Sequence, residues 1–350
     1  MNSIPGIGTG GRITMAHGGG GTAMRALIDT LFLEAFSATP HAAQEDQARL
    51  PLAPLLAGGD RLAFTTDSFV VEPLEFPGGN IGTLAVCGTV NDLVVGGARP
   101  VALSAAFILA EGLELACLRR IVAAMADCAR EAGVRIVTGD TKVVPKGACD
   151  GLYVTTSGVG VIPAGRAISI TAARPGDVVL VNGTLGDHGA AILCARGDLA
   201  LDVAIASDCA PLGGLVEALL AAAPGTRSLR DATRGGVAGV LSELAEASAV
   251  SLTLDETALP VRPEVEGVCD ILGLEALFLA NEGKLVAVVP QAEAEAALAA
   301  LRAHPLGQQA ALIGTVAEAG PHGPSVVVRN AFGGRRTVTM PSGEQLPRIC

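Results

Sequence analysis

Apolar and polar positions follow two different periods along the first half of the chain. Apolar residues three and four apart predict helices at 22–36 and at 113–133, and Gly133 ends the second of these. Short apolar runs that end in glycine, proline or polar residues predict strands at 61–67, 101–109, 134–140 and 151–163. The segment 81–98 is apolar almost throughout, and its length favours a buried helix.

The second half opens with an "RPGD" turn and an apolar strand, so we place a domain boundary near 165–173. Helices are then predicted near 186–196, 211–223, 235–248 and 291–303, and strands near 250–254, 284–289, 311–316 and 324–329. After about residue 333 the pattern fades into one short strand and a tail rich in proline and glycine. Helices and strands interleave in both halves, which predicts two domains of α/β or α+β type.

Composition and charge narrow the classes of function. Half of the 350 residues are hydrophobic, enough for a large core, and the net charge of −11 disfavours a nucleic-acid surface. The longest apolar run, "VALSAAFILA", is much shorter than the ~20 residues of a membrane span. The first residues contain neither a basic leader nor an apolar export signal, so we expect a cytoplasmic protein without membrane contacts.

The eight cysteines include one that is unlike the others. No CxxC pair occurs, which disfavours a zinc knuckle or a redox dithiol, and seven cysteines stand in contexts typical of small buried hydrophobes. Cys350 is the last residue of the sequence, in "PRIC", where a chain usually frays. This thiol therefore calls for a functional explanation.

Aspartates fall at informative positions. Asp67 and Asp140 each follow an apolar run, Asp231 precedes a predicted helix, and Asp92 lies inside an apolar one. Helix capping is the ordinary explanation for Asp140 or Asp231 alone. Asp92 is harder to explain in this way, because a buried carboxylate is costly unless it is paired or bound to metal. Carboxylates that converge in this way suit Mg²⁺ and a nucleotide phosphate.

Other motifs are individually weak. No GxxxxGK[ST] occurs, so any ATP site differs from a P-loop, and the GxSxG and HExxH signatures are also absent from the sequence. The "HGGGG" run at 17–21 is as consistent with a flexible turn as with a phosphate site. Lys142 and Glu282 are of types usually found at solvated surfaces, and His188 begins a predicted helix, where a structural role is the simpler interpretation.

Taken together, these stretches resemble the HypE family of hydrogenase maturation factors, of the superfamily that includes aminoimidazole ribonucleotide synthetase and selenophosphate synthetase. The resemblance runs from about residue 13 to residue 350. The strand-end aspartates and the DATRGG-like stretch are shared across the superfamily, whereas the terminal "PRIC" is specific to HypE. The matching segments are "ITMAHGGGG", "TTDSFVVEPLEFPGGNIG", "VCGTVNDLVVGGARP", "TGDTKVV", "GDHGAAI", "DATRGG", "LANEGKL" and "PRIC".

The resemblance implies a two-domain aminoimidazole ribonucleotide synthetase-like (PurM-like) fold, α/β followed by α+β. We expect an ATP-binding and dimerisation domain at 15–168, a second domain at 169–334 and a mobile tail at 335–350. Residues 1–14 are expected to be an N-terminal extension, on which the resemblance is silent. The first domain is expected to pair with a second copy through a shared barrel of strands, with ATP bound near that contact.

The resemblance also implies a reaction. The Cys350 thiol is expected to receive a carbamoyl group from the carbamoyltransferase HypF. ATP-dependent dehydration then gives a thiocyanate, whose cyanide passes to iron on the HypC–HypD scaffold during [NiFe]-hydrogenase assembly. The expected cofactors are ATP and Mg²⁺.

The resemblance implies roles for eight residues besides Cys350, and the chemistry of the tail adds Arg348. The magnesium and phosphate ligands are expected to be Asp67, Asp92, Asp140 and Asp231. Asn91 and Arg234 are expected to contact ATP, and Lys142 and Glu282 to face the modified thiol of Cys350. Arg348 is expected to hold the tail when it is docked.

Two other hypotheses stay open at this point. A small-molecule ATP enzyme of the same superfamily, of aminoimidazole ribonucleotide or selenophosphate type, has no need of Cys350. A tail that serves only for docking has no need of ATP, and the position of Cys350 does not fit a prenylation box.

Overall fold

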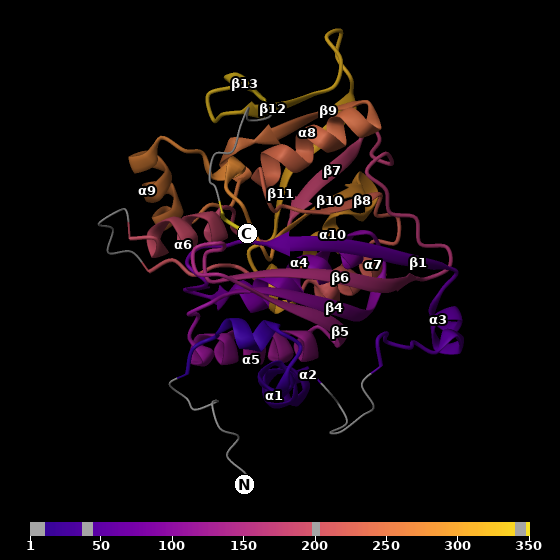
Figure 1. The fold of residues 1–350 in the computed structure, drawn as a ribbon. Coiled ribbons are helices and arrows are strands. Elements are labelled where there is room, and N and C mark those ends of the chain that lie inside the picture. The colour runs from indigo at the N-terminus through magenta and orange to yellow at the C-terminus, as the bar shows by residue number, and fades with distance from the viewer. Residues whose placement is uncertain (1–10, 37–44, 198–203, 340–347) are drawn as a thin grey trace.

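A four-stranded sheet forms the centre of the first half of the molecule (Figure 1). The computed structural model describes residues 11–36, 45–197, 204–339 and 348–350. Strands β4 and β5 run parallel and the other neighbours run antiparallel. In spatial order the strands are β1 (Arg61–Phe69), β6 (Leu152–Ile162), β4 (Arg99–Ala110) and β5 (Arg135–Val144).

Helix α4 (Ile81–Val95) lies at the centre of the fold. The side chain of Asn80 caps its first turn by accepting hydrogen bonds from the N–H groups of Gly82 and Thr83. The helix packs against β1 and β6, and it also contacts α7 and β8 of the second half. All but two of its residues are buried, because it is covered on both sides, and this explains why its sequence is apolar all round. Helix α5 (Leu115–Glu131) packs beside it.

The second half contains a seven-stranded sheet. Its interior strand β7 (Asp177–Val181) is buried on both faces, which explains the unbroken apolar run "VVLV". Val179 and Val181 pack with helix α8 (Gly236–Ser248), whereas Val178 and Leu180 join a core shared with the first half. The spatial order is β13 (Arg335–Val338), β12 (Ser325–Arg329), β9 (Val250–Asp255), β11 (Ala311–Glu318), β7, β10 (Leu285–Pro290) and β8 (Ser228–Asp231).

The remaining elements are short or peripheral. Among the described residues, no helix is both long and apolar enough to cross a membrane. The other helices are α1 (Thr22–Leu27), a π-helix η2 (Ile28–Leu33), α2 (Glu34–Phe36), α3 (Leu52–Gly58), α6 (Asp187–Ala195), α7 (Gly213–Ala222), α9 (Pro263–Leu272) and α10 (Ala294–Ala303). Short 3₁₀ helices occupy Met15–Gly18, Glu256–Ala258, Ala276–Phe278, Gln291–Glu293 and Pro305–Gly307, and a small ribbon joins β2 (Glu75–Phe76) to β3 (Gly79–Asn80).

The predicted elements agree with the structure except at some ends. Strand β5 continues through Val144, so the prediction that Asp140 closes a strand is wrong. The reason is that Thr141–Val144 go on pairing with Phe107–Ala110 of β4. Strand β1 likewise runs two residues beyond Asp67. Helices α3 and α9 and strand β8 were not predicted.

The two ends of the described chain both reach the main core. Residues 1–10 of the predicted N-terminal extension lie outside the described residues, but Ile13 is fully buried. The predicted short strand after residue 333 is present as β13. The tail at 335–350 is predicted to be mobile. Most of it, residues 340–347, also lies outside the described residues. Ile349 is 4% exposed and belongs to the core that the two halves share.

Candidate active site

Three of the predicted aspartates come from three different elements and meet where α4 crosses the first sheet. Asp67 is on β1, Asp92 on α4 and Asp231 at the end of β8. Thr65, two residues before Asp67 on the same face of β1, donates a hydrogen bond of 2.7 Å to Oδ2 of Asp92. Gly88, one turn before Asp92, lies against β1, and a Cβ atom there would stand 3.8 Å from Oδ2 of Asp67.

The three carboxylates perturb one another. Burial raises the pKa of Asp92, and the neighbouring charge of Asp67 adds to that effect. Burial, together with the charges of Asp92 and Asp67, raises the pKa of Asp231 to about 6. The guanidinium of Arg230 acts in the opposite direction on both pKa values but does not cancel the shift. Arg230 therefore compensates only part of the negative charge of the three aspartates, and the remaining charge favours the binding of a metal cation.

This donor set fits Mg²⁺ that arrives with a nucleotide better than a permanent protein-bound metal. Within the described ranges, no three His, Cys, Asp or Glu side chains already stand in a metal-binding arrangement. The four predicted metal ligands are thus not assembled within one chain. Mg²⁺ commonly takes one or two carboxylates and completes its shell with phosphates and water. The hard oxygen donors of Asp67, Asp92 and Asp231 match that preference.

Asp140 and Lys142 lie apart from this cluster. Both point to the open face of the first sheet, where Asp140 pairs in register with Ala106, and they form an ion pair of 3.1 Å. The hydrogen bond from Lys142 lowers the pKa of Asp140. Asp67 points to the opposite face, toward α4, and β5 is the edge strand three positions from β1. A single chain therefore does not bring Asp140 or Lys142 to the other aspartates.

Glu282 lies in the turn before β10, and its carboxyl group is buried. It is 3% exposed, and its Oε1 atom has no hydrogen-bond partner among the described residues. Burial raises the pKa of Glu282 well above its usual range, and the charges of Asp208, Asp231 and Asp67 add to the shift. A buried carboxyl with a strongly raised pKa and an unpaired oxygen is a candidate acid–base group.

Asp208 binds the backbone of the turn that carries Glu282, and the sequence analysis did not predict it as a site residue. Its two carboxylate oxygens accept hydrogen bonds of 3.1 Å from the N–H groups of Glu282 and Gly283, and Lys284 Nζ lies 2.9 Å from Oδ2. Burial acts to raise the pKa of Asp208, but the charge of Lys284 and the hydrogen bonds from Lys284 and Glu282 hold the pKa below its usual range. An aspartate in the otherwise apolar stretch "VAIASDCAPLGGL" was the signal available.

Asn91 and Arg234, the two predicted ATP contacts, differ in their exposure and in their hydrogen-bond partners. Asn91 is 2% exposed, and its amide binds the backbone at Ala210, Leu212 and Glu282. In this structure it fixes the turn that carries Glu282, and its contact with ATP stays a prediction. Arg234 is exposed, and its positive charge acts on the Glu282 carboxyl. Its guanidinium forms no ion pair within the described parts of the chain.

The last three residues are docked beside α6. Ile349 is buried, and its carbonyl oxygen lies 2.8 Å from Nε2 of His188. The Arg348 side chain forms ion pairs with Glu72 and, at 3.0 Å, with Asp150. Cys350 is partly buried and packs against the core that the two halves share, so the tail end lies at the junction of the two sheets (Figure 1).

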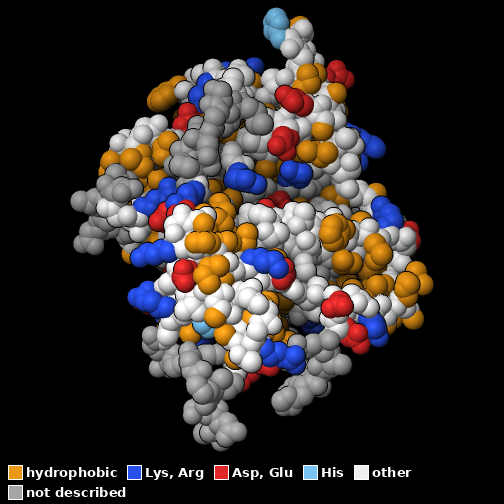
Figure 2. Space-filling view, in the orientation of Figure 1, with side chains coloured by type: hydrophobic (Ala, Val, Ile, Leu, Met, Phe, Trp, Pro, Cys, Tyr) orange, Lys and Arg blue, Asp and Glu red, His pale blue; other side chains and the backbone are white. Residues whose placement is uncertain are grey.

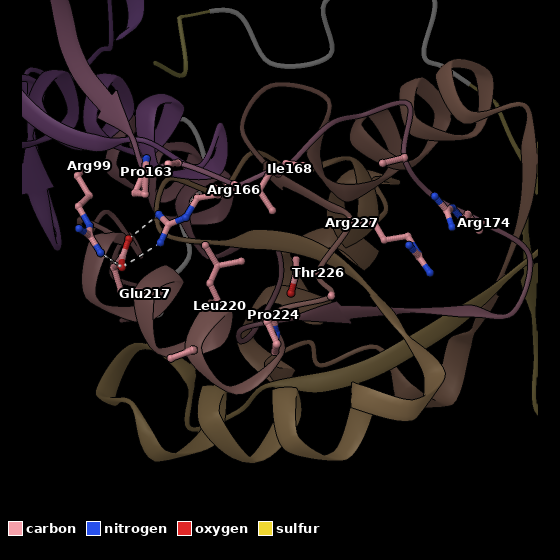
Figure 3. Close-up of a pocket in the computed structure, with 16 residues that line it drawn as sticks. Arg99, Pro163, Arg166, Ile168, Arg174, Glu217, Leu220, Pro224, Thr226 and Arg227 are labelled. Carbon is pink, nitrogen blue, oxygen red and sulfur yellow. Dashed lines mark hydrogen bonds and ion pairs between the residues drawn. The ribbon is translucent and has the colours of Figure 1, made fainter. Parts of the chain in front are cut away.

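A separate cavity of about 720 Å³ lies beside the linker between β6 and β7 (Figure 3). None of the predicted site residues lines it. Glu217 binds Arg166 at 2.7 Å and Arg99 at 3.1 Å, and Asp177, which adjoins the cavity, binds Arg227 at 2.8 Å. These ion pairs hold the linker against both halves, so the cavity is a structural junction and the carboxylate cluster is the candidate active site.

The fold and the carboxylate-rich site define a protein of the AIR synthase related class. Residues 44–162 match the AIR synthase related protein, N-terminal domain, and residues 174–326 match the C-terminal domain of the same class. This confirms the predicted two-domain PurM-like fold.

Within this class, the chain belongs to the HypE family. It is 63% identical to the carbamoyl dehydratase HypE of Rhodobacter capsulatus over 340 residues, which cover 97% of this chain and 98% of the relative. A crystal structure of HypE in complex with ATP superposes with a TM-score of 0.90 at 48% identity, over 96% of this chain and 99% of that one. A HypE–HypF complex matches with a TM-score of 0.78 at 46% identity, over 90% and 100%.

Proposed function

We propose that this chain is an ATP-dependent carbamoyl dehydratase that converts a carbamoyl group on Cys350 into a thiocyanate, and so supplies cyanide for the iron of [NiFe]-hydrogenase. Membership of the HypE family and the ATP complex of a close relative support this function. The observation that carries it is the placement of Glu282. Its unpaired carboxyl lies within electrostatic reach of the aspartate cluster, and its supporting loop is linked through His188 to the docked tail.

The chemistry requires an activated oxygen and a proton acceptor. The thiocarbamate S–C(=O)–NH₂ keeps its oxygen because oxide is a very poor leaving group. Transfer of the ATP γ-phosphoryl group to that oxygen creates a C–O–phosphate bond, and phosphate then leaves as the C≡N bond forms. The two N–H protons depart, so the products are the thiocyanate, ADP and phosphate.

The carboxylate cluster serves the phosphate end of this reaction. Mg²⁺, when bound with ATP, neutralises charge on the phosphates, and Asp67, Asp92 and Asp231 would hold it. Arg234 is proposed to bind a phosphate oxygen, since it is exposed and its charge acts on the nearby Glu282. These groups position ATP and stabilise developing charge, which is the main contribution of proteins to phosphoryl transfer.

Glu282 serves the nitrogen end. A general base is most effective when its pKa lies near the working pH, and burial raises the pKa of Glu282 toward that range. Its unpaired Oε1 accepts an N–H proton of the activated substrate. Asp208 keeps the backbone of Glu282 fixed, which preserves this orientation.

A second copy of the chain completes the site in this proposal. Leu62, Phe64 and Ile108 are exposed on the open face of the first sheet. Figure 2 shows hydrophobic side chains gathered at mid-height, in the centre of the view and at its right side, in the region of β1 and α3. We propose that a second copy, paired through this sheet in the expected shared barrel of strands, supplies its own Asp140 and Lys142 to the cluster. Lys142 then stabilises the substrate oxygen.

The partners follow from the relatives and from the chemistry. A relative forms a complex with HypF, which we propose as the donor of the carbamoyl group to Cys350. The HypC–HypD complex is the proposed acceptor of the cyanide. The alternative, a small-molecule synthetase or kinase of the same superfamily, gives no reason for the buried contacts that hold Ile349 next to Cys350.

Mass spectrometry of the C-terminal peptide tests the proposal. The protein is incubated with HypF, carbamoyl phosphate and ATP, and the peptide is followed over time. We expect a carbamoyl adduct on Cys350 that then loses one water in an ATP-dependent step. A Cys350 that stays unmodified while HypF is active would overturn the proposed function.

A further inference from the structure

His188 links the docked tail to the loop that supports Glu282. It is the second residue of α6, and it is fully buried. Its Nε2 atom lies 2.8 Å from the carbonyl oxygen of Ile349, and its Nδ1 atom lies 2.8 Å from Oγ of Ser207. The ring of Phe76 stands edge-on against the imidazole, with 5.6 Å between centroids, which limits rotation of the ring.

The partners of the imidazole determine where its proton is. The carbonyl oxygen of Ile349 only accepts, so Nε2 must carry a proton and donate. Burial lowers the pKa of His188, and the ring is therefore neutral near pH 7 with Nδ1 unprotonated. Nδ1 accepts from the Ser207 hydroxyl, which itself accepts from the N–H of Cys209 at 3.1 Å. The three hydrogen bonds all point from the loop toward the tail.

We propose that His188 is a positioning residue for the reacting tail: its Nε2–H binds the Ile349 carbonyl and thereby sets the place of the Cys350 thiol. This inference rests on the proposed function, in which Cys350 carries the substrate. Ser207 is followed by Asp208, whose carboxylate binds the backbone of Glu282. The loop that contains Ser207 and Asp208 thus holds both His188, which binds the tail, and Glu282, the proposed base.

The nature of the contact gives this proposal a specific consequence. His188 binds a backbone carbonyl, one residue before the thiol, so it holds the tail equally whether Cys350 is free, carbamoylated or converted to thiocyanate. The ion pairs of Arg348 are half-exposed and weakened by solvent, whereas the His188 contact is buried. The buried hydrogen bond therefore contributes more to docking than the surface ion pairs.

Two amide variants separate the two nitrogens of the ring. The amide of His188→Gln reaches the position of Nε2, and that of His188→Asn the position of Nδ1. We expect Cys350 of H188N to react about tenfold faster with a thiol-alkylating reagent, because loss of the buried hydrogen bond releases the tail more often. We expect its dehydration rate after carbamoylation to fall about 10²-fold, because the thiol is misplaced. H188Q is expected to stay near the wild-type values.

Modification of Cys350 is measured on the C-terminal peptide alone, and the result distinguishes failure of the proposed function from failure of the proposed role of His188. Cleavage after Glu344 releases a peptide that contains Cys350 and no other cysteine. Carbamoylation by HypF requires a released tail, so H188N is expected to be loaded at least as fast as the wild type. Wild-type protein that is never carbamoylated contradicts the proposed function. Wild-type protein that reacts, together with H188N that docks and dehydrates at the same rate, overturns the role of His188.

A measurement on the unmodified protein covers the case in which H188N does not fold. The chain has five histidines, so selective ¹⁵N-histidine labelling gives few imidazole signals. We expect one ring with the Nε2–H tautomer whose signals shift when residues 349 and 350 are deleted. An Nδ1–H tautomer for His188, or signals that ignore the deletion, would contradict the proposal.

Discussion

The backbone N–H of Glu282 donates a 3.1 Å hydrogen bond to Oδ1 of Asp208, so one buried carboxylate holds another residue's carboxyl in place. The side chain of Asp208 is 4% exposed, and its charge is balanced by Lys284 at 2.9 Å. Asp208 also helps to raise the pKa of Glu282, since like charges oppose ionisation. The relationship gives Glu282 both its fixed orientation and part of its affinity for a proton.

Replacing Glu282 with glutamine tests its role as base. The variant keeps the shape of the side chain and the backbone contacts with Asp208 but cannot accept the proton. We expect the single-turnover dehydration rate of carbamoylated protein to fall about 10²–10⁴-fold, while loading by HypF stays unchanged. The exposed Glu318 provides the control variant E318Q. Dehydration by E282Q at the wild-type rate rules out Glu282 as the base.

Removing the Asp208 carboxylate is expected to destabilise the protein strongly. Asp208→Ala leaves the ammonium of Lys284 buried without a partner, which typically costs about 3–5 kcal/mol in the free energy of unfolding. Urea unfolding at pH 7 measures the difference. Because the folded-state pKa of Asp208 lies below its usual value, the carboxylate stabilises the fold above pH 4 or so, and this contribution is lost as the pH falls through the folded-state pKa. The wild-type and D208A stabilities should therefore converge in acid.

Gly283 leaves no room for a side chain. A Cβ atom there would stand 1.9 Å from the carbonyl oxygen of Asp208. We expect Gly283→Ala to lower the free energy of unfolding by about 3 kcal/mol or more and to displace Glu282, with loss of dehydration. Gly267, within α9, has nothing within 4 Å of the corresponding position, so Gly267→Ala is the matched control and should stabilise the helix by up to about 1 kcal/mol.

The carboxylate cluster is expected to weaken the fold at neutral pH in the absence of ligand. The folded-state pKa of Asp231 is about 6, above its ordinary value of 3.8, so the folded protein binds more protons than the unfolded chain between these values. Stability then falls as the pH rises through that window. Asp231→Asn should stabilise the ligand-free protein by about 1 kcal/mol at pH 7, after allowance for solvent screening. It should also remove the stabilisation that Mg²⁺ and ATP give the wild type, as measured by thermal unfolding.

The sequence indicated much of this site because its signals are local. Asp92 stands out in an apolar helix, and its neighbours in the structure, Asp67 and Asp231, follow an apolar run and precede a predicted helix, respectively. Asp208 was missed because its partners, the N–H groups at 282 and 283, lie more than seventy residues away. The separation of Asp140 from Asp67 was missed because strand order and the direction of each side chain depend on long-range pairing.

Mixing two inactive variants tests whether two copies share each site. In the proposed dimer, Asp67 comes from one subunit and Asp140 from its partner, since a single chain does not bring these two residues together. We expect Asp67→Asn and Asp140→Asn each to abolish ATP-dependent dehydration as pure proteins. After unfolding and refolding of an equal mixture, about a quarter of the sites regain both aspartates, so about a quarter of the wild-type activity should return.

The control is Phe64→Asp added to both variants, which places a charge on the apolar open face. Size-exclusion chromatography should then show monomers, and no activity should return. Mixtures that stay inactive although mixed dimers form would show that each site is built from a single chain.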